Sequence, residues 1–282
     1  MNAQLPADPP TCYRHPDRQT YLRCNRCERP ICGDCMRSAA VGHQCVDCVQ
    51  AGARTIRERR TRFGGRERSS ATPVVTYTLI AINVLAFIAE MASVEVQRQF
   101  WLWPRAVAGG EFYRLVTSVF LHAGTMHLLL NMWVLYVVGP PLEMGLGRLR
   151  YIGLYAVSGL GGSVLVYLLS PVDTPTLGAS GAIYGLFAAT LVVAKRLTLD
   201  VRWVAAVIVI NLAFTFVVPA ITSHQISWQA HVGGLIAGAV ITAAYVYVPR
   251  QRRDLLQAGA TVAALVLFAA LIWWRTAELV VA

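Results

Sequence analysis

A serine flanked by glycines, in the motif Gly178-x-Ser180-Gly181, stands between a polar turn and an apolar run that continues to Ala194. At the first turn of a membrane-spanning helix, a hydroxyl lies among free backbone N–H groups, and these and the helix dipole stabilise negative charge. A serine nucleophile and its oxyanion need such surroundings. The structural alternative is an N-cap serine between glycines that serve packing alone.

Seven apolar runs must position this serine. Of the 282 residues, 56% are hydrophobic and 14% charged, which is too apolar for a soluble domain. Most runs approach the ~20 residues that cross ~30 Å of hydrocarbon. The fourth and fifth are short, so we expect them to be buried among other helices. The runs are roughly 73–92, 124–142, 151–170, 179–194, 203–219, 228–248 and 255–274.

The basic residues predict the direction of these runs. The net charge is +10, and Lys195 is the single lysine. Basic clusters precede the first run and lie between runs two and three, four and five, and six and seven, so all fall on one side if the N-terminus is cytosolic. The C-terminus is then outside the cell membrane. The arginine- and alanine-rich, lysine-poor composition suggests a GC-rich bacterial genome. In the long outer loop 93–123 we expect half-helices rather than open coil.

This topology gathers four polar residues at one depth near the outer face. They are His127 and Asn131 in the second run, Ser180 in the fourth and His231 in the sixth. Polar groups inside a membrane are costly and indicate function. Ser180 and His231 would form a nucleophile–base pair, and no Asp or Glu lies at that depth in these three runs, so a dyad is predicted. The alternative for a single His or Asn is an interhelical hydrogen bond.

Three supporting features accompany the predicted dyad. Tyr184, one helical turn from Ser180, is expected to pack on the imidazole of His231. The Ser180 amide and the side chains of His127 and Asn131 would form an oxyanion hole. Small residues repeat every fourth position beside both catalytic candidates, which allows close helix approach. These faces are Gly181-x3-Gly185 and Ala230-x3-Gly234-x3-Gly238, whereas His122 and Glu143 are expected to be structural.

All seven cysteines lie between residues 12 and 48. The polar, proline-rich start predicts no signal peptide, so we expect a cytosolic head in which cysteines bind metal. Disulfides or free thiols are the alternative. Four pairs of ligands supply two tetrahedral zinc sites, and zinc would provide most of the folding energy of so short a segment. The pairs are Cys12/His15, Cys24/Cys27, Cys32/Cys35 and Cys45/Cys48, with His43 as a spare that could replace Cys45 or Cys48.

The head resembles B-box and related cross-braced zinc fingers, in which alternate ligand pairs share a metal. That resemblance implies one structural zinc on Cys12, His15, Cys32 and Cys35, and a second on Cys24, Cys27, Cys45 and Cys48. The resemblance identifies no cytosolic partner for the head. An arginine-rich stretch follows, which could suggest nucleic-acid binding. We instead expect a solvated linker and no nucleic acid, because the run ends directly at a membrane span.

Four motifs in order along the remaining chain resemble the rhomboid family of intramembrane serine proteases. They are Glu111-Phe112-Tyr113-Arg114, His122-x4-His127-x3-Asn131, Gly178-x-Ser180-Gly181 with Tyr184, and Ala230-His231-x2-Gly234-x3-Gly238. The family usually has Trp-Arg where this chain has Tyr113-Arg114. The resemblance implies an all-α membrane protein with a six-helix core plus one C-terminal helix, preceded by the zinc-binding domain. The expected divisions are a head 1–50, linker 51–72, protease domain 73–274 and tail 275–282.

The resemblance further implies that Ser180 is the nucleophile and His231 the general base and acid. Implied substrates are single-span membrane proteins, cut near the outer face where small or helix-breaking residues let the helix unwind. The connection 220–227 with the fifth run would form a gate. One alternative is a non-catalytic rhomboid-like protein that binds transmembrane clients. Another is a channel or transporter with a histidine relay, which the lack of buried acidic partners and of a repeat disfavours.

Overall fold

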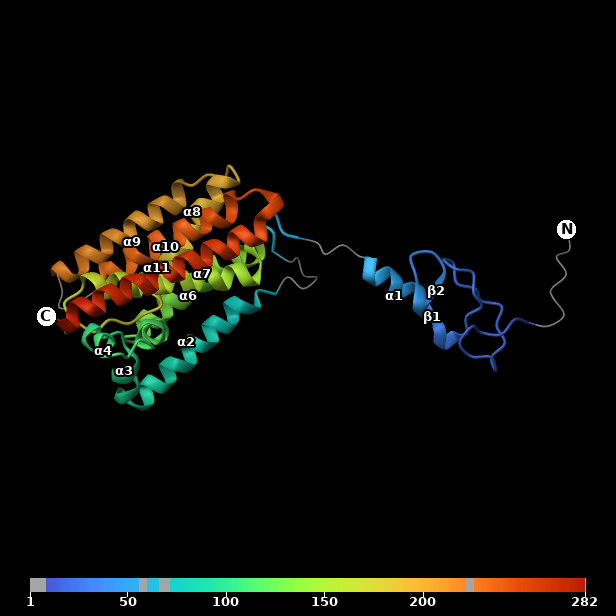
Figure 1. Cartoon of the computed structure of the whole chain (residues 1–282), viewed down its shortest axis with the longest axis horizontal. Helices are drawn as coiled ribbons and strands as arrows, with labels where there is room; N and C mark the ends of the chain where they lie inside the picture. The colour runs from blue at the N-terminus through green and yellow to red at the C-terminus, as the bar shows by residue number, and fades with distance from the viewer. Residues whose placement is uncertain (1–8, 56–59, 66–71, 222–225, 282) are drawn as a thin grey trace. The chain divides into compact units, whose positions relative to one another are not determined.

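The computed structural model describes residues 9–55, 60–65, 72–221 and 226–281. The chain forms two compact units, Met1–Glu58 and Arg59–Ala282. Figure 1 colours them in chain order, from the blue head to the red last helix. The linker expected over 51–72 is described only in part, because 56–59 and 66–71 lie outside these ranges.

The first unit is small and has little regular structure. Its elements are the 3-10 turn η1 (Gly33–Cys35), strands β1 (Met36–Ser38) and β2 (His43–Cys45), and helix α1 (Val46–Thr55). The strands form an antiparallel hairpin in which Met36 pairs with Cys45. The buried cluster of this unit consists of six cysteines and Ile31. Among its described residues, therefore, the interior holds sulfur ligands in place of an aliphatic core.

The second unit is a bundle of long helices. Six are long and apolar enough to cross a membrane, so the protein is a multi-pass membrane protein. The helix α8 between them has 17 residues. Together the seven helices match the seven predicted runs, and the last continues through the residues expected as a tail. They are α2 (Val74–Ala92), α6 (Thr125–Leu146), α7 (Arg148–Leu169), α8 (Ser180–Arg196), α9 (Arg202–Ile221), α10 (Trp228–Tyr247) and α11 (Arg253–Val281), the last preceded by η3 (Arg250–Arg252).

The expectation that the fourth and fifth spans are both short and buried is right for α8 and wrong for α9. More than half of the residues of α8 are buried. By contrast, α9 has 20 residues, and 11% of its stretch Arg202–Pro219 is buried. Its surface is apolar, with Val209 and Phe214 well exposed, and such a helix can face lipid without a partner. Half of the expected gate, 220–227, lies outside the described residues, because these omit 222–225.

Glycine seams hold the centre of the bundle together, where α10 packs on both α7 and α8. A Cβ on Gly234 would overlap the carbonyl oxygen of Gly181, and one on Gly238 would overlap the backbone of Gly185. A Cβ on Gly162 in α7 would lie 2.7 Å from the Ala230 carbonyl oxygen. Backbone therefore meets backbone along these faces, as the small-residue repeats predict.

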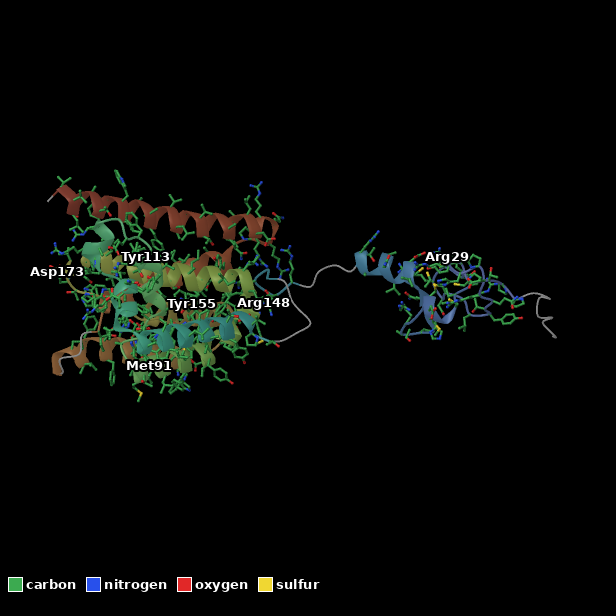
Figure 2. All side chains as sticks on the ribbon, turned by 90° about the horizontal axis from the view of Figure 1, so that it is seen from below. Arg29, Met91, Tyr113, Arg148, Tyr155 and Asp173 are labelled. Atoms are coloured by element: carbon green, nitrogen blue, oxygen red, sulfur yellow. The ribbon has the colours of Figure 1, made fainter. Side chains whose placement is uncertain are left out.

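The outside of the bundle is apolar and its inside is mixed. Figure 2 shows Met91 pointing away from the bundle and Tyr155 lying within it, and their exposed fractions are 74% and 4%. The buried carboxylate of Glu143 accepts hydrogen bonds from the backbone N–H groups of Val75 (3.0 Å) and Thr76 (2.8 Å). Glu143 thus caps the start of α2, which confirms its expected structural role.

The long loop before α6 contains short helices, as expected: α3 (Val94–Phe100), α4 (Pro104–Ala108), α5 (Arg114–Thr117) and η2 (Ser118–Phe120). The buried guanidinium of Arg114 fastens them. Its Nε donates to Glu111 at 2.8 Å, and Nη1 donates to the Arg98 carbonyl oxygen at 2.8 Å. The Tyr113 hydroxyl also donates to Glu111 at 2.7 Å. The Glu111–Arg114 motif therefore fixes the loop that precedes the site.

Candidate active site

Ser180 and His231 are in hydrogen-bond contact. Ser180 begins α8, and its Oγ lies 2.8 Å from Nε2 of His231 on α10. The imidazole is 8% exposed. Ser180 directly precedes Gly181, and His231 lies three residues before Gly234. These two glycines belong to the seam in which the backbones of α8 and α10 touch. The close packing of these two helices is what brings a hydroxyl and an imidazole together over 51 residues of sequence.

Tyr184 packs against the histidine. Its ring is buried and stacks on the His231 ring with 4.1 Å between centroids and 13° between planes. Tyr184 follows Ser180 by one helical turn, so both side chains lie on the same face of α8. The stacked ring restricts rotation of the imidazole about χ2 and shields it from solvent.

Two polar side chains of α6, those of His127 and Asn131, were predicted to support the serine, and His127 lies beside the backbone of Gly178. Gly178 has φ +131°, and a Cβ there would lie 2.8 Å from Cε1 and 3.1 Å from Nε2 of His127, so a side chain would displace that ring. His127 Nδ1 accepts from the Ala123 N–H at 3.4 Å, which leaves the proton of a neutral ring on Nε2. The buried amide nitrogen of Asn131 has no hydrogen-bond partner among the described residues. Both side chains thus carry free donors.

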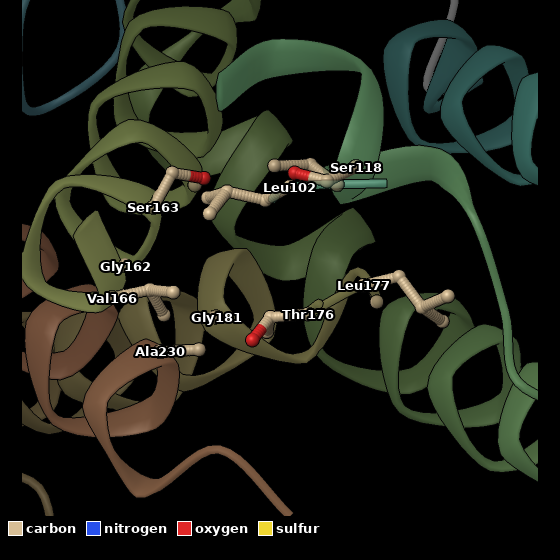
Figure 3. Close-up of a pocket in the computed structure, with 12 residues that line it drawn as sticks. Leu102, Ser118, Gly162, Ser163, Val166, Thr176, Leu177, Gly181 and Ala230 are labelled. Atoms are coloured by element: carbon tan, nitrogen blue, oxygen red, sulfur yellow. The ribbon is translucent and has the colours of Figure 1, made fainter. Parts of the chain in front are cut away.

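A small cavity lies beside the serine's loop. It holds about 20 Å³, enough for one water molecule. Figure 3 shows the hydroxyls of Ser118, Ser163 and Thr176 in its otherwise largely apolar lining, with Gly181 close by. The cavity therefore gives a polar niche next to the first turn of α8.

His122 was expected to form hydrogen bonds with the outer loop, and its backbone, but not its ring, does so. Its N–H donates to the Glu90 carboxylate at 3.0 Å, and its carbonyl accepts from Gln97 at 3.4 Å. The ring nitrogens have no hydrogen-bond partner in the part of the chain that is described. Burial, and after it the neighbouring His127, lowers the pKa of His122 to about 4, so the ring is neutral near pH 7. It meets the His127 ring edge to face at 5.2 Å.

The sequence reasoning missed Thr215. Its Oγ1 lies 2.8 Å from Nδ1 of His231, on the side of the ring away from Ser180. The expectation of a dyad rested on the absence of acidic residues at this depth in spans two, four and six, whereas Thr215 is a neutral residue of span five. The sequence does contain a signal for it, because Thr215 places a polar hydroxyl within an otherwise apolar span.

The head brings its eight predicted ligands into two groups. Within each group the candidate ligand atoms all lie within 4.8 Å of one another. His15 Nδ1, for example, lies 3.3 Å from the sulfur of Cys32 and 3.4 Å from that of Cys35. The groups are the two alternating sets implied by the cross-brace. They are Cys12, His15, Cys32 and Cys35, and Cys24, Cys27, Cys45 and Cys48, with His43 in neither.

The donor sets fit a tetrahedral cation. Backbone N–H groups of Cys45 (3.2 Å) and Arg26 (3.5 Å) donate to the sulfur of Cys24. Burial raises the pKa of Cys24, but such hydrogen bonds outweigh it and lower the value to about 6. Hydrogen bonding to Cys45 and burial raise the pKa of Cys48 to about 12. Without a cation, neighbouring thiols this close together cannot all lose their protons. A metal ion among them would deprotonate all four. These clusters can therefore bind metal.

Comparisons with known proteins concern the helix bundle. Residues 109–248 match the model of the Rhomboid domain. The chain is similar to YdcA of Bacillus subtilis, a protein assigned to the rhomboid proteases, with 37% identity over 60% of this chain and 87% of YdcA. It is 34% identical to rhomboid protease GluP of the same organism, over 61% of this chain and 35% of GluP. Rhomboid protease AarA of Providencia stuartii is 29% identical over 51% of this chain and 59% of AarA.

The matched range 109–248 contains every residue of the candidate active site. It begins after the cysteine head, which therefore lies outside it. The chain spans most of YdcA but about a third of GluP and less than two thirds of AarA, so these relatives share the bundle rather than their whole length.

Proposed function

The chain belongs to the rhomboid family of intramembrane serine proteases, and we propose that it cleaves single-span membrane proteins with Ser180 as nucleophile and His231 as general base. The observation that carries these residue roles is the 2.8 Å contact between Ser180 Oγ and His231 Nε2. That distance is within the range over which a base accepts a proton in hydrolysis.

The proposed reaction has two halves. His231 Nε2 takes the Ser180 proton as the oxygen attacks the scissile carbonyl, and the resulting imidazolium then protonates the leaving amine. This leaves an acyl group on Ser180. In the second half His231 deprotonates a water molecule, which attacks the ester. The imidazolium then returns that proton to Ser180 Oγ as the ester bond breaks and the second product leaves. The polar niche beside Gly181 supports a supply of water close to the serine.

The oxyanion of each tetrahedral intermediate would be held by three donors. They are the backbone N–H of Ser180 at the first turn of α8, Nε2–H of His127 and the side-chain amide of Asn131. The unpartnered state of the Asn131 amide supports this role, because a buried donor without a partner is costly unless a ligand uses it.

The basic connections support an N-terminus in the cytosol and a C-terminus outside. The lysine-poor composition and the bacterial relatives support a bacterial plasma membrane as the location. With that orientation Ser180 is near the outer face, and cleavage occurs there. A peptide bond inside a helix is hydrogen-bonded and shielded, so substrates with small or helix-breaking residues near the cut would be favoured because they unwind more readily.

For the head we propose two structural zinc ions in a B-box-like cross-brace, with the eight ligands named above. Zinc would supply folding energy there and take no part in hydrolysis. The head would stay in the cytosol and contact a cytosolic partner other than nucleic acid.

The test is cleavage of a model single-span substrate by purified protein in detergent. Wild type is compared with Ser180→Ala and His231→Ala, and a fluorophosphonate probe that labels reactive serines is applied to each. We expect product and labelling from wild type alone. Cleavage that survives Ser180→Ala would overturn the serine mechanism. Absence of both cleavage and labelling in folded wild type would favour the non-catalytic, client-binding alternative.

A further inference from the structure

Thr215 occupies a polar junction inside the bundle. Its side-chain oxygen lies 2.8 Å from Nδ1 of His231, 3.0 Å from the carbonyl oxygen of Asn211 and 3.2 Å from the hydroxyl of Tyr184. The residue is 2% exposed, although most of α9 is not buried. Thr215 is thus a point at which this loosely packed helix reaches the candidate active site.

Counting protons assigns the direction of these hydrogen bonds. A threonine hydroxyl has one proton to donate and two lone pairs with which to accept. The Asn211 carbonyl can only accept, so it takes the Thr215 proton. The Thr215 oxygen then accepts from the Tyr184 hydroxyl and from the Nδ1–H of His231. All three contacts are satisfied at once only in this arrangement.

This arrangement selects one form of the histidine. A neutral imidazole with its proton on Nδ1 carries its lone pair on Nε2, the nitrogen that lies 2.8 Å from Ser180 Oγ. That tautomer is the one that can accept the serine proton. The opposite tautomer would turn an N–H toward Ser180 and leave the hydroxyl no base.

A neutral acceptor also suits the location. Within the described residues, no carboxylate is hydrogen-bonded to His231, so the orienting role that an acid has in serine–histidine–acid triads has no acidic candidate in contact with this ring. A buried carboxylate at this depth would have to be desolvated among apolar helices. A hydroxyl can fix the tautomer and the ring plane without that cost.

We propose that Thr215 is a positioning residue for the hydrolysis, which holds His231 in the tautomer that activates Ser180. The proposal rests on the Ser180–His231 pair proposed above. In this proposal a chain of hydrogen bonds runs from Ser180 through His231 and Thr215 to the Asn211 carbonyl. Tyr184 supports this chain by stacking on the imidazole and by donating to Thr215. The helix α9 thereby contributes directly to the chemistry of a site built on α8 and α10.

The experiment compares three substitutions in the cleavage assay. Thr215→Val keeps the branched shape and removes the hydroxyl, whereas Thr215→Ser keeps the hydroxyl. Thr190→Val is the matched control, because Thr190 on α8 also donates to the carbonyl four residues earlier, that of Leu186, at 2.9 Å. We expect Thr215→Val to lower kcat ~10-fold or more with KM unchanged, as for loss of one buried hydrogen bond. Thr215→Ser should stay within about threefold of wild type, and Thr190→Val within about twofold.

Two results would overturn the proposal while leaving the dyad intact: wild-type kcat in Thr215→Val, or an equal loss in Thr215→Ser and Thr215→Val. The Ser180→Ala control reports on the dyad in the same assay, so the two proposals fail separately. A measurement without Thr215 variants uses 15N-histidine NMR of the whole protein, with the His231 signals identified by their loss in His231→Gln. We expect a protonated Nδ1 and an unprotonated Nε2 in wild type. The reverse would refute the proposal even if a variant failed to fold.

Discussion

The head and the helix bundle are stabilised in opposite ways. In the head, the buried cluster is six cysteines and one isoleucine, and the candidate ligand atoms crowd together in two groups. In the bundle, glycines let the backbones of α8 and α10 touch, and large apolar side chains point outward. The head therefore depends on what binds its sulfurs, whereas the bundle depends on the shape of its helices.

This difference has a physical basis. A short soluble segment buries too little apolar surface to offset its loss of conformational entropy, so bound metal must supply the difference. Between helices in lipid, burial of apolar surface supplies little driving force because lipid tails are equally apolar, and close van der Waals packing replaces it. Metal removal and packing changes should consequently act on one unit each.

Removal of metal should have the largest effect. A chelator that strips both zinc ions should remove ~10 kcal/mol per ion from the folding of the head. We expect protease-resistant head in the untreated full chain and rapid cleavage of residues 9–55 after chelation, with intramembrane activity unchanged. Cys24→Ser should lower zinc content, measured by mass spectrometry, from two ions to one. Chelation that abolished activity would contradict the independence of the two units.

Asn131→Ala should separate catalysis from stability within the bundle. Loss of one oxyanion donor costs ~3 kcal/mol of transition-state stabilisation, or 10²–10³ in kcat. Because the Asn131 amide nitrogen has no hydrogen-bond partner among the described residues, its removal should leave the melting temperature nearly unchanged. The contrast is Asn83→Ala on α2, where the amide donates to the Leu79 carbonyl at 2.7 Å. That variant should lose stability and keep kcat. An Asn131 variant with full activity would exclude the oxyanion role.

Gly234→Ala tests whether backbone contact holds the site together. The added Cβ would overlap the Gly181 carbonyl oxygen, and we expect a loss of ~2 kcal/mol in stability together with most of the activity. Gly259→Ala on α11 is the control, because a Cβ there meets nothing within 4 Å. It should be neutral or slightly stabilising. Zinc content should stay at two ions in both variants. Equal behaviour of the two proteins in thermal unfolding would argue against the seam.

Arg105→Ala should have the smallest effect. Arg105 and Asp173 form an ion pair at 2.6 Å, but both side chains are more than half exposed. Exposed pairs contribute ~1 kcal/mol or less. We therefore expect a melting temperature within a few degrees of wild type and unchanged kcat. A large loss would mean that surface charge, and not helix shape alone, stabilises the bundle.

The sequence alone predicted the number and the approximate positions of the long helices. Hydropathy is a local property, so the runs that become α2, α6, α7, α10 and α11 can be recognised without a fold. The resemblance of the head to cross-braced zinc fingers implied which ligand pairs lie together, and the structure forms those two groups. Depth within the spans was enough to bring Ser180 and His231 to one level, and the glycines beside them indicated which helices approach closely.

The tertiary structure decided which side of each apolar helix meets a neighbour. A run such as α9 is apolar on all sides, so its sequence contains no face that identifies the interior. The short run was therefore wrongly expected to be buried, and the contact of Thr215 with His231 was not predicted. Rotation of a helix about its own axis is set by packing against other helices. Only that packing put a hydroxyl from α9 against the imidazole of α10.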